Sequence, residues 1–163
     1  MLFQIEACKL HPEAIIPTRT NNTDVGLDLY AIEDVFIPLG TTAKVATGIA
    51  LNIPVNYIGK VEDRSGMALK GLKVGGGIID PGYNGDISVV LNNLTFDKNS
   101  TVVKVNDSTG LFPYGETKTG YQVKKGDRIA QILTFRVDTP EVQEVKSLWG
   151  SERGSNGFSS SGR

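Results

Sequence analysis

The sequence predicts an all-β protein built from many short strands, and three observations lead to this prediction. Nineteen glycines and seven prolines interrupt the 163 residues at short intervals. Between them, apolar and polar residues alternate with period two, which is the spacing of a strand and not of a helix. The alternating runs are rich in Val, Ile, Thr and Phe, which favour strands. Many short strands separated by turns are typical of a β-sandwich or a β-barrel.

The elements follow in chain order. In the run from Thr41 to Pro54, every second residue from Ala43 to Ile53 is Ala, Val, Thr, Ile or Leu, so we expect one strand with a single buried face. The only helix that we expect is short, Gly66–Leu69, because glycines bound it. Three later runs are also expected to be strands: Ile87–Leu91, Thr101–Val105 and Ile129–Val137.

The charge balance excludes several classes of partner. Seventeen basic residues nearly match eighteen acidic ones, and the formal net charge is -1. Binding to nucleic acid or to a membrane surface favours a clustered positive excess, so we expect neither. No apolar run is long enough to cross a bilayer, and the first residues do not resemble a signal peptide. We therefore expect a soluble, cytoplasmic protein.

Cysteine and histidine are too scarce for several kinds of site. The chain has one cysteine, Cys8, and one histidine, His11. An internal disulfide cannot form, and a structural zinc site, which needs about four N or S ligands, cannot be built. Zinc-dependent nucleobase deaminases are excluded for the same reason. We interpret His11 as a surface residue, so catalysis would rest on carboxylates, amides, hydroxyls and arginines.

Two stretches depart from the rhythm of short strands. Residues 94–121 are rich in Asn, Asp, Thr, Ser and Gly, and we interpret them as an insertion in a single domain of residues 1–150, since adjacent strands are normally joined by about two to five residues. The insertion is either a surface excursion or a docking surface for another macromolecule, with aromatic anchors. Those aromatic residues are Phe112, Tyr114 and Tyr121. The tail, residues 151–163, is dominated by Gly and Ser and is expected to be flexible.

Two segments carry groups that suit a phosphate, and a third is a turn. Arg64-Ser65-Gly66 combines a guanidinium, a hydroxyl and backbone N–H groups at the start of the short helix, although this tripeptide also occurs by chance. Gly126–Gln131 is a turn that leads into a strand, and we interpret its Asp127 and Arg128 as a surface or interface ion pair. In the tail, Arg153–Gly162 offers N–H donors, hydroxyls, one arginine and the aromatic Phe158, as in a loop that wraps a phosphate.

The segment from Gly75 to Asp86 suits a flat ligand. Ile78-Ile79 leads into a Pro-Gly turn and a strand leaves it, which predicts a β-hairpin. The flanking glycines would let a ring approach the backbone closely. Asp80 could hold a nucleophilic water as a general base, and Tyr83 could pack against a ring. The alternative is an ordinary turn capped by the aspartate.

Together with Asp24–Ala31, these segments resemble, in the right order, the five motifs of the trimeric dUTP diphosphatase (dUTPase) family. The likeness spans nearly the whole chain and is strongest over Val74–Asn92 and Lys124–Leu133. Several residues depart from the family pattern. Asp63 stands where proline is usual before Arg-Ser-Gly, Val25 replaces a small alanine, Pro81-Gly82 precedes the tyrosine, and the tail differs at Asn156, Ser159 and Ser161.

The resemblance implies a jelly-roll β-barrel that forms a homotrimer, with each active site assembled from three chains. The uracil of dUTP would lie in the segment from Gly77 to Ser88, beside Ile78 and Ile79, and Tyr83 would pack on the deoxyribose. The phosphates would be contacted by Arg64, Ser65 and Gly66, with Gln131 nearby. The tail of a neighbouring chain would close the site through Arg153, Phe158 and Ser159.

The resemblance also implies a Mg²⁺-dependent hydrolysis of dUTP to dUMP and pyrophosphate. Asp80 would activate the water that attacks the α-phosphate, and Asp28 would reach the metal only through water, since Mg²⁺ can be held mainly by the phosphates. Two alternatives stay open. Deoxycytidine triphosphate deaminases share the fold, but their catalytic glutamate aligns with Val90, which cannot move protons. The chain could also be a non-catalytic interaction protein, because a fold does not establish a function.

Overall fold

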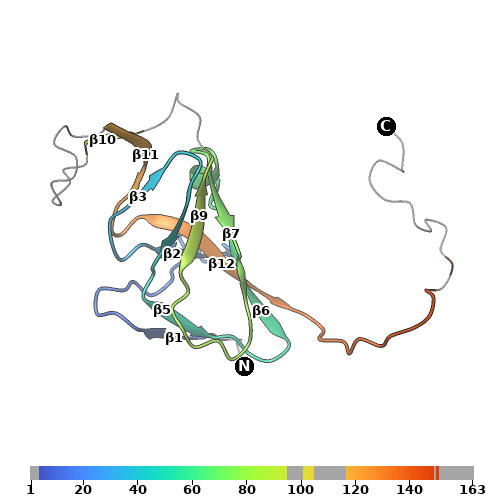
Figure 1. Cartoon of the computed structure of the whole chain (residues 1–163). Coiled ribbons are helices and arrows are strands. Elements are labelled where there is room, and N and C mark those ends of the chain that lie inside the picture. Colours follow the sequence, from blue (N-terminus) through green and yellow to red (C-terminus); the bar gives the residue numbers. More distant parts are fainter. Residues whose placement is uncertain (1–3, 95–100, 105–116, 149, 151–163) are drawn as a thin grey trace.

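The computed structural model describes residues 4–94, 101–104, 117–148 and 150 (Figure 1). Within these residues the chain forms twelve short strands and one four-residue helix, so the prediction of an all-β fold is confirmed. In chain order the elements are β1 (Glu6–Lys9), β2 (Leu27–Tyr30), β3 (Val35–Pro38), β4 (Thr42–Val45), β5 (Ile49–Asn52), β6 (Tyr57–Glu62), α1 (Ser65–Ala68), β7 (Leu72–Gly75), β8 (Ile78–Ile79), β9 (Val89–Asn93), β10 (Thr101–Lys104), β11 (Thr117–Val123) and β12 (Arg128–Arg136).

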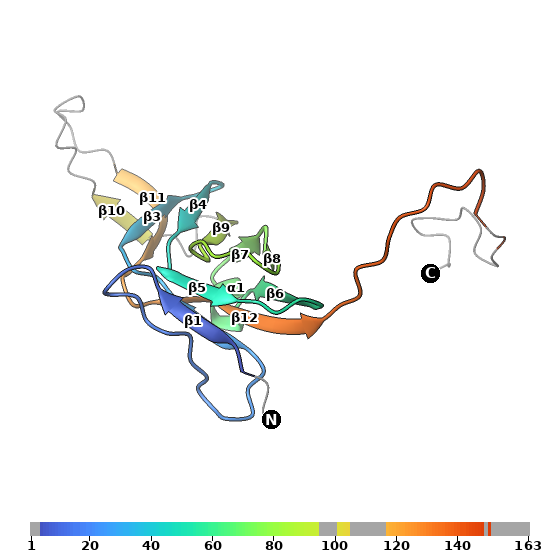
Figure 2. The ribbon, with the colours of Figure 1, turned by 90° about the horizontal axis from the view of Figure 1, so that it is seen from below.

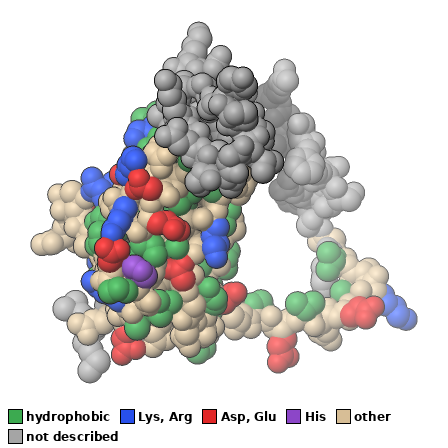
Figure 3. All heavy atoms as spheres, turned by 60° about the vertical axis from the view of Figure 1, so that its left-hand side comes forward, with side chains coloured by type: hydrophobic (Ala, Val, Ile, Leu, Met, Phe, Trp, Pro, Cys, Tyr) green, Lys and Arg blue, Asp and Glu red, His purple; other side chains and the backbone are tan. Residues whose placement is uncertain are grey.

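Four small antiparallel sheets make up the body of the molecule (Figures 1 and 2). The strand orders are β2-β12-β6-β8, β4-β9-β7, β10-β11-β3 and β1-β5. All four sheets contribute to one cluster of buried apolar side chains. Full burial of one Leu or Ile side chain stabilises a fold by roughly 1.5–3 kcal/mol. The largest fully buried members are Leu29, Ile37, Ile49, Leu72, Ile87, Leu91, Ile129 and Ile132. On the surface, acidic and basic side chains are interspersed on the face shown in Figure 3.

The predicted strand from Thr41 to Pro54 is wrong as a single element, because β4 and β5 lie in different sheets. The chain turns at Gly48, whose φ is 66° and whose added Cβ would lie 2.9 Å from the Cβ of His11. Just before it, the buried Thr47 hydroxyl donates a hydrogen bond to the carbonyl of Ile87 at 2.9 Å. The period-two alternation runs through this break without change, so the pattern alone does not reveal it.

The predicted β-hairpin around Asp80 is also wrong. Strand β8 pairs with β6, and β9 pairs with β4 and β7, so the two strands belong to different sheets. Residues 80–88 therefore connect two sheets. The connection turns through a hydrogen bond from the Tyr83 N–H to the Asp80 carbonyl at 3.3 Å, and its end is tied to β5 by the bond from the Ile87 N–H to the Ile49 carbonyl at 2.8 Å.

Other predicted boundaries move by one or two residues. The helix and β12 each begin one residue earlier than expected, and β9 begins two residues later. Strand β10 is found where expected and ends at Lys104, while Val105 lies outside the described residues. The sequence patterns do not reveal β1, β2, β3, β6, β7 and β11. Strand β1 illustrates the cause. All four of its residues are exposed, so buried and exposed residues do not alternate along it.

Two parts of the chain extend from the body (Figures 1 and 2). Strands β10 and β11 pair with each other, and β11 joins the body by pairing with β3. Strand β11 begins inside the stretch 94–121 and continues to Val123, so the last residues of that stretch belong to a sheet of the body. After β12 the chain leaves as an extended arm, residues 137–148, which is exposed from Asp138 onward. In the part of the chain that the structure describes, no helix has the length and apolar character to cross a membrane.

Candidate functional site

The central sheet brings three of the sequence motifs together. Gln131 on β12 lies opposite Asp28 of β2 on one side and opposite Glu62 of β6 on the other. Because the chain continues directly from Glu62 through Asp63 into Arg64, the turn before α1 lies beside the same row of residues. Antiparallel pairing thus places groups that are about 35 to 100 residues apart in sequence on neighbouring strands.

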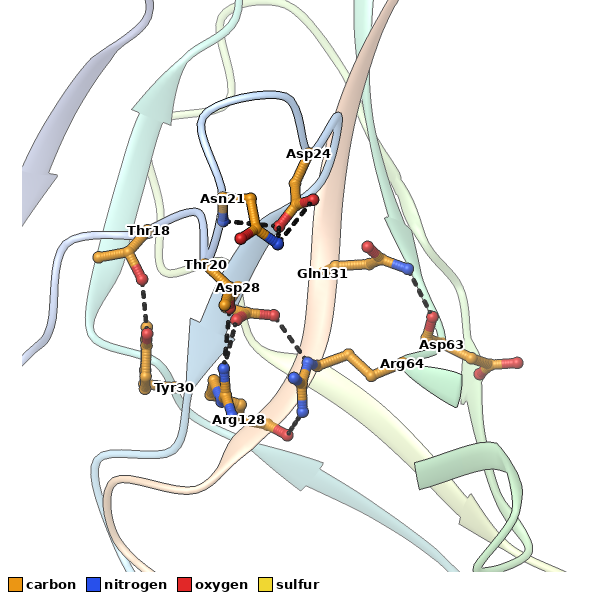
Figure 4. Close-up of polar contacts among 10 residues, drawn as sticks. All are labelled: Thr18, Thr20, Asn21, Asp24, Asp28, Tyr30, Asp63, Arg64, Arg128 and Gln131. Carbon is orange, nitrogen blue, oxygen red and sulfur yellow. Dashed lines mark hydrogen bonds and ion pairs between the residues drawn. The ribbon is translucent and has the colours of Figure 1, made fainter. Parts of the chain in front are cut away.

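A charged cluster stands at this point of the sheet (Figure 4). The side chain of Asp28 is only 12% exposed. Its carboxylate accepts a hydrogen bond from Arg64 Nε at 2.7 Å and another from Arg128 Nη1 at 3.3 Å. Arg64 Nη1 also donates to the Arg128 carbonyl at 3.2 Å, and Arg128 Nη1 donates to the Thr20 hydroxyl at 3.1 Å. Two guanidinium groups thus hold one carboxylate, and the guanidinium N–H donors that this carboxylate does not use suit an anion.

The orientation of Arg64 leaves it able to bind a further group. Only two of the five N–H donors of a guanidinium are used in its hydrogen bonds to Asp28 and to the Arg128 carbonyl. Its side chain is 26% exposed, so the remaining donors are accessible. Asp28 therefore holds the Arg64 guanidinium in one orientation while leaving several of its N–H donors for another ligand.

Gln131 is held between two other motifs. Its Nε2 donates to the Asp63 carbonyl at 2.9 Å, and its Oε1 packs against Gly26, where an added Cβ would lie 2.2 Å away. The amide therefore has one further N–H donor, and any side chain at position 26 would displace it. Position 26 thus needs glycine, because the Gln131 side chain approaches its main chain closely.

Asp63, the residue that departs from the usual proline, is itself well anchored. Its carboxylate accepts from the Val74 N–H at 2.6 Å and forms an ion pair with Lys73, both on β7. Burial raises the pKa of Asp63, but the hydrogen bonds from Lys73 and Val74 and the charge of Lys73 together lower it below its ordinary value. The carboxylate thus ties the end of β6 to β7 immediately before Arg64.

These groups surround the first of two candidate pockets, which we call the Arg64 pocket, with a volume of about 310 Å³. Of the predicted site residues it contains Asp28, which was expected to reach the metal through water, the arginine and serine of the second motif, and the glutamine of the fourth. Its lining residues are Thr20, Asp24, Val25, Gly26, Asp28, Arg64, Ser65 and Gln131. Gly66 follows on α1 and is exposed.

The second candidate pocket, the Asp80 pocket, has a volume of about 240 Å³. Its lining residues are Lys44, Ile78, Ile79, Asp80, Tyr83, Asp86, Ser88 and Val90. Asp80 is exposed, and within the described residues its carboxylate has no hydrogen bond or ion pair. An unpartnered carboxylate has lone pairs available for water, as a general base requires.

The ring of Tyr83 is fixed at the mouth of the Asp80 pocket. Its hydroxyl donates to the Asp86 carbonyl at 3.0 Å, and 46% of the residue is exposed. The Asp86 carboxylate in turn accepts from Ser88 and, at 3.4 Å, from Thr47. Gly77 lies just outside the pocket, where its carbonyl accepts from the Val61 N–H at 2.7 Å.

The two pockets of one chain share no lining residue. The structure therefore brings Asp28, Arg64, Ser65 and Gln131 together, and it brings Ile78, Ile79, Asp80, Tyr83 and Ser88 together, but it does not unite the two groups in one chain. Arg153, Phe158 and Ser159 lie outside the described residues. A larger cavity of about 420 Å³ lies beside β1 and holds none of the predicted site residues.

The donor set limits how a metal could bind. In the described ranges, no three His, Cys, Asp or Glu residues are grouped so that they could hold a metal ion. Both oxygens of Asp28 are already used by guanidinium groups. These residues fit a Mg²⁺ ion held mainly by oxygen atoms of a bound phosphate and by water, with Asp28 reaching it through water.

Sequence reasoning missed one residue beside the Arg64 pocket and two that line the Asp80 pocket. Arg128 is part of the Gly-Asp-Arg turn, but only the β2–β12 register shows that it pairs with Asp28. Asp86 lies in the segment already singled out and could have been found there. Lys44 gave no signal, because it is an ordinary polar residue of an alternating strand.

Comparisons with known proteins agree with this arrangement. A family model described as dUTPase matches residues 12–109 and 101–162. The chain is 38% identical over 162 residues to the mitochondrial deoxyuridine 5'-triphosphate nucleotidohydrolase of Homo sapiens, in a match that covers 99% of this chain and 56% of that protein. It is 38% identical over 166 residues to the protein of the same name from Solibacter usitatus, covering 99% of this chain and 97% of that protein.

Solved structures show the same likeness. The dUTPase of Staphylococcus bacteriophage 80alpha with dUpNHpp has a TM-score of 0.81 and 30% identity, over 98% of this chain and 99% of that chain. A mutant dUTPase from phage phi11 of S. aureus, described with a structural Mg(II) ion, has a TM-score of 0.74 and 28% identity, over 91% of this chain and 100% of that chain.

The fold and these likenesses define an all-β protein of the jelly-roll class. The chain belongs to the dUTPase family, as its five motifs predicted. It spans 56% of the human relative and nearly the whole of the bacterial one.

Proposed function

We propose that this chain hydrolyses dUTP to dUMP and pyrophosphate in a Mg²⁺-dependent reaction. Such an enzyme keeps uracil out of DNA and supplies dUMP for thymidylate synthesis. Relatives with matches across nearly the whole chain are named for this reaction. The observation that carries the proposal is that one dUTPase-family chain holds both an unpartnered carboxylate at Asp80 and a guanidinium-lined pocket at Arg64.

In this proposal the Asp80 pocket takes the nucleoside. The uracil lies against the backbone of Gly77, Ile78 and Ile79 near Ser88, and the fixed ring of Tyr83 packs on the deoxyribose, where it excludes a 2′-hydroxyl. Asp80 accepts a proton from the water that attacks the α-phosphate. A valine at position 90 lines this pocket, so no carboxylate at that position is available for deamination.

The Arg64 pocket takes the phosphates. Arg64, Ser65 and Gly66 donate to phosphate oxygens, and Gln131 adds an amide N–H. Asp28 fixes the guanidinium beforehand, so that the donors need no reorganisation as charge moves from the α-phosphate to pyrophosphate. When Mg²⁺ is bound it neutralises part of this charge, and the residues present suit a metal carried by the phosphates with Asp28 behind a water.

The separation of the two pockets in one chain supports a site shared between subunits of a homotrimer. One chain would supply the Arg64 pocket, a second the Asp80 pocket, and a third the tail with Arg153, Phe158 and Ser159. The extended arm supports the same arrangement, because several of its apolar side chains are exposed and are available to a neighbouring chain. These side chains are Val142 at 98%, Val145 at 52% and Leu148 at 86% exposure.

A product assay with four nucleotides tests the proposal. The chain is incubated with dUTP, dCTP, dTTP or UTP in the presence of Mg²⁺, and the products are identified. We expect dUMP and pyrophosphate from dUTP, little turnover of the other three nucleotides, and loss of turnover when the metal is chelated. Release of ammonia from dCTP would instead identify a deaminase, and no product from any nucleotide would indicate an interaction protein.

A further inference from the structure

Tyr121 of β11 contacts the helix that follows Arg64. Its hydroxyl accepts a hydrogen bond from Lys70 Nζ at 3.0 Å and donates to the sulfur of Met67 at 3.9 Å. The ammonium group of Lys70 also lies 5.4 Å from the centre of the Tyr121 ring. A single side chain from the β10-β11-β3 sheet therefore contacts both the buried Met67 of α1 and Lys70, the second residue after the helix.

The position of α1 fixes the main chain of Arg64. Met67 is the anchor of the helix, since it is only 5% exposed and is the sole buried residue of its four. The N–H groups of Met67 and Ala68 both donate to the Arg64 carbonyl at 2.9 Å. A displacement of Met67 would therefore move the peptide that carries Arg64 and the Ser65 that follows it.

The position of Tyr121 depends in turn on how closely β11 approaches β3. At the preceding residue, Gly120, an added Cβ would lie 2.4 Å from the Ile37 carbonyl oxygen and 2.9 Å from the Cα of Pro38. The Leu39 N–H donates to the Thr119 carbonyl at 3.2 Å in the same stretch. The opposite edge of β11 pairs with β10. Strand β11 therefore links β10 to α1 through Tyr121.

We infer that Tyr121 is a positioning residue through which the seating of β11 against β3 sets the affinity of the Arg64–Gly66 turn for the phosphates of the substrate. This inference rests on the proposed function for the identity of the ligand, but not for the contact itself. Tyr121 touches neither pocket, so it acts through Met67 and Arg64.

Two variants test the inference by different routes. Tyr121→Phe keeps the ring and removes the hydroxyl that joins Lys70 and Met67. Gly120→Ala keeps Tyr121 but pushes β11 away from β3. The matched control is Gln122→Ala on the same strand, whose side chain points to the opposite face and donates to the Val123 carbonyl at 2.8 Å. Steady-state kinetics with dUTP are measured for each, together with the hydrogen exchange of the Met67 and Ala68 amides in the protein without substrate.

We expect Tyr121→Phe to raise KM for dUTP by about two- to tenfold with kcat within about twofold. This is the size of effect expected if the free energy of one lost hydrogen bond inside the protein is transmitted to ground-state binding. Exchange of the two amides should accelerate, and Gly120→Ala should act in the same direction. Gln122→Ala should change neither quantity. Wild-type KM and wild-type amide exchange in Tyr121→Phe would overturn the inference, even if Gly120→Ala does not fold.

The exchange measurement separates this inference from the proposed function. If the wild-type protein does not hydrolyse dUTP, the proposed function fails, while faster exchange at Met67 and Ala68 in Tyr121→Phe would still establish that Tyr121 holds the turn. If the wild-type protein hydrolyses dUTP and Tyr121→Phe leaves KM unchanged, the inference fails alone. A fall in thermal stability with unchanged KM would mark a purely structural role and would also overturn it.

Discussion

At the scale of single residues, environment separates the two aspartates of the proposed site. Asp28 is largely buried, and both of its oxygens are bound by arginines. Asp80 is exposed and, in the described part of the chain, has no polar partner. A carboxylate already committed to two guanidinium groups is a poor base, whereas a free one can orient a water. In the proposed reaction, Asp28 would orient the guanidinium that binds phosphate, and Asp80 would activate the water.

Replacement of Asp80 tests the division of roles. We expect Asp80→Asn to lower kcat by at least a hundredfold, the usual contribution of a general base, with dUTP binding retained, because the amide keeps the shape but cannot accept the proton. Single-turnover kinetics and a binding assay with a non-hydrolysable analogue measure the two effects separately. Retention of more than a tenth of the wild-type kcat would show that Asp80 is not the base.

Asp63 gives a prediction about pH. Because its pKa is lowered in the folded protein, the unfolded chain binds the proton more tightly, and Asp63 stabilises the fold above its unfolded pKa. This contribution is lost as the pH falls from about 4 through the lower folded pKa. We expect Asp63→Asn to cost about 1–2 kcal/mol of unfolding free energy at pH 7, with the difference from wild type shrinking at acidic pH.

Denaturant unfolding of both proteins between pH 7 and pH 3 measures this difference. Glu144→Gln, which removes a carboxylate from the extended arm, is the control and should show no such convergence. A gap that stays constant as the pH falls would mean that the ion pair with Lys73 does not contribute to stability.

The sequence predicted Arg64 and Asp80 as site residues from motifs of local chemistry, and it predicted Asp28 and Gln131 through the resemblance to the dUTPase family. It did not identify Arg128 as the second partner of Asp28, because that contact depends on the register of β2 against β12, which is set by packing across the sheet. Nor did it indicate that the amide of Gln131 spans Gly26 and Asp63. The residue types could be predicted, but the pairings between distant segments could not.

At the scale of elements, the all-β class and the short helix could be predicted, while the way strands join sheets could not. The alternation through Thr41–Pro54 is continuous, yet Gly48 divides it between two sheets. The Pro-Gly turn after Asp80 suggested a hairpin, yet its flanking strands pair elsewhere. Period-two patterns and turn residues report local conformation, whereas strand partners are chosen by burial of side chains far apart in sequence.

The projecting strand pair gives a prediction at this scale. Joining Leu94 to Thr117 by a short Gly-Ser linker removes β10 and keeps the pairing of β11 with β3. Since loop closure depends only weakly on length, and Tyr121 remains in place, we expect kcat and KM for dUTP to stay within a few-fold of wild type. Enzyme kinetics and sedimentation check this. A large fall in kcat with the oligomer intact would place the removed segment in the active site.

At the scale of the whole molecule, one chain contains two separate candidate pockets and an arm that leaves its body (Figure 1). This arrangement favours an assembly in which neighbours complete each other's sites, since neither pocket alone holds both a base and phosphate donors. Removal of residues from Arg153 onward should then leave a trimer in equilibrium sedimentation and abolish most dUTP hydrolysis. A truncated protein with full activity would exclude the tail from the site.

Complementation between two inactive variants tests the shared site directly. Asp80→Asn retains the Arg64 pocket, and Arg64→Met retains the Asp80 pocket, so each variant alone should be nearly inactive. If each site draws these two pockets from different subunits, random mixing of equal amounts by co-expression or refolding should restore about a quarter of the wild-type activity, because one site in four then combines the two intact halves.

The control mixes Asp80→Asn with a chain that carries both substitutions. No chain in this mixture has an intact Asp80, so the mixture should remain inactive. Melting temperatures establish beforehand that Arg64→Met folds, since it leaves the buried Asp28 with one arginine fewer. If the mixture of the two single variants forms mixed trimers but stays inactive, the two pockets must act within one chain.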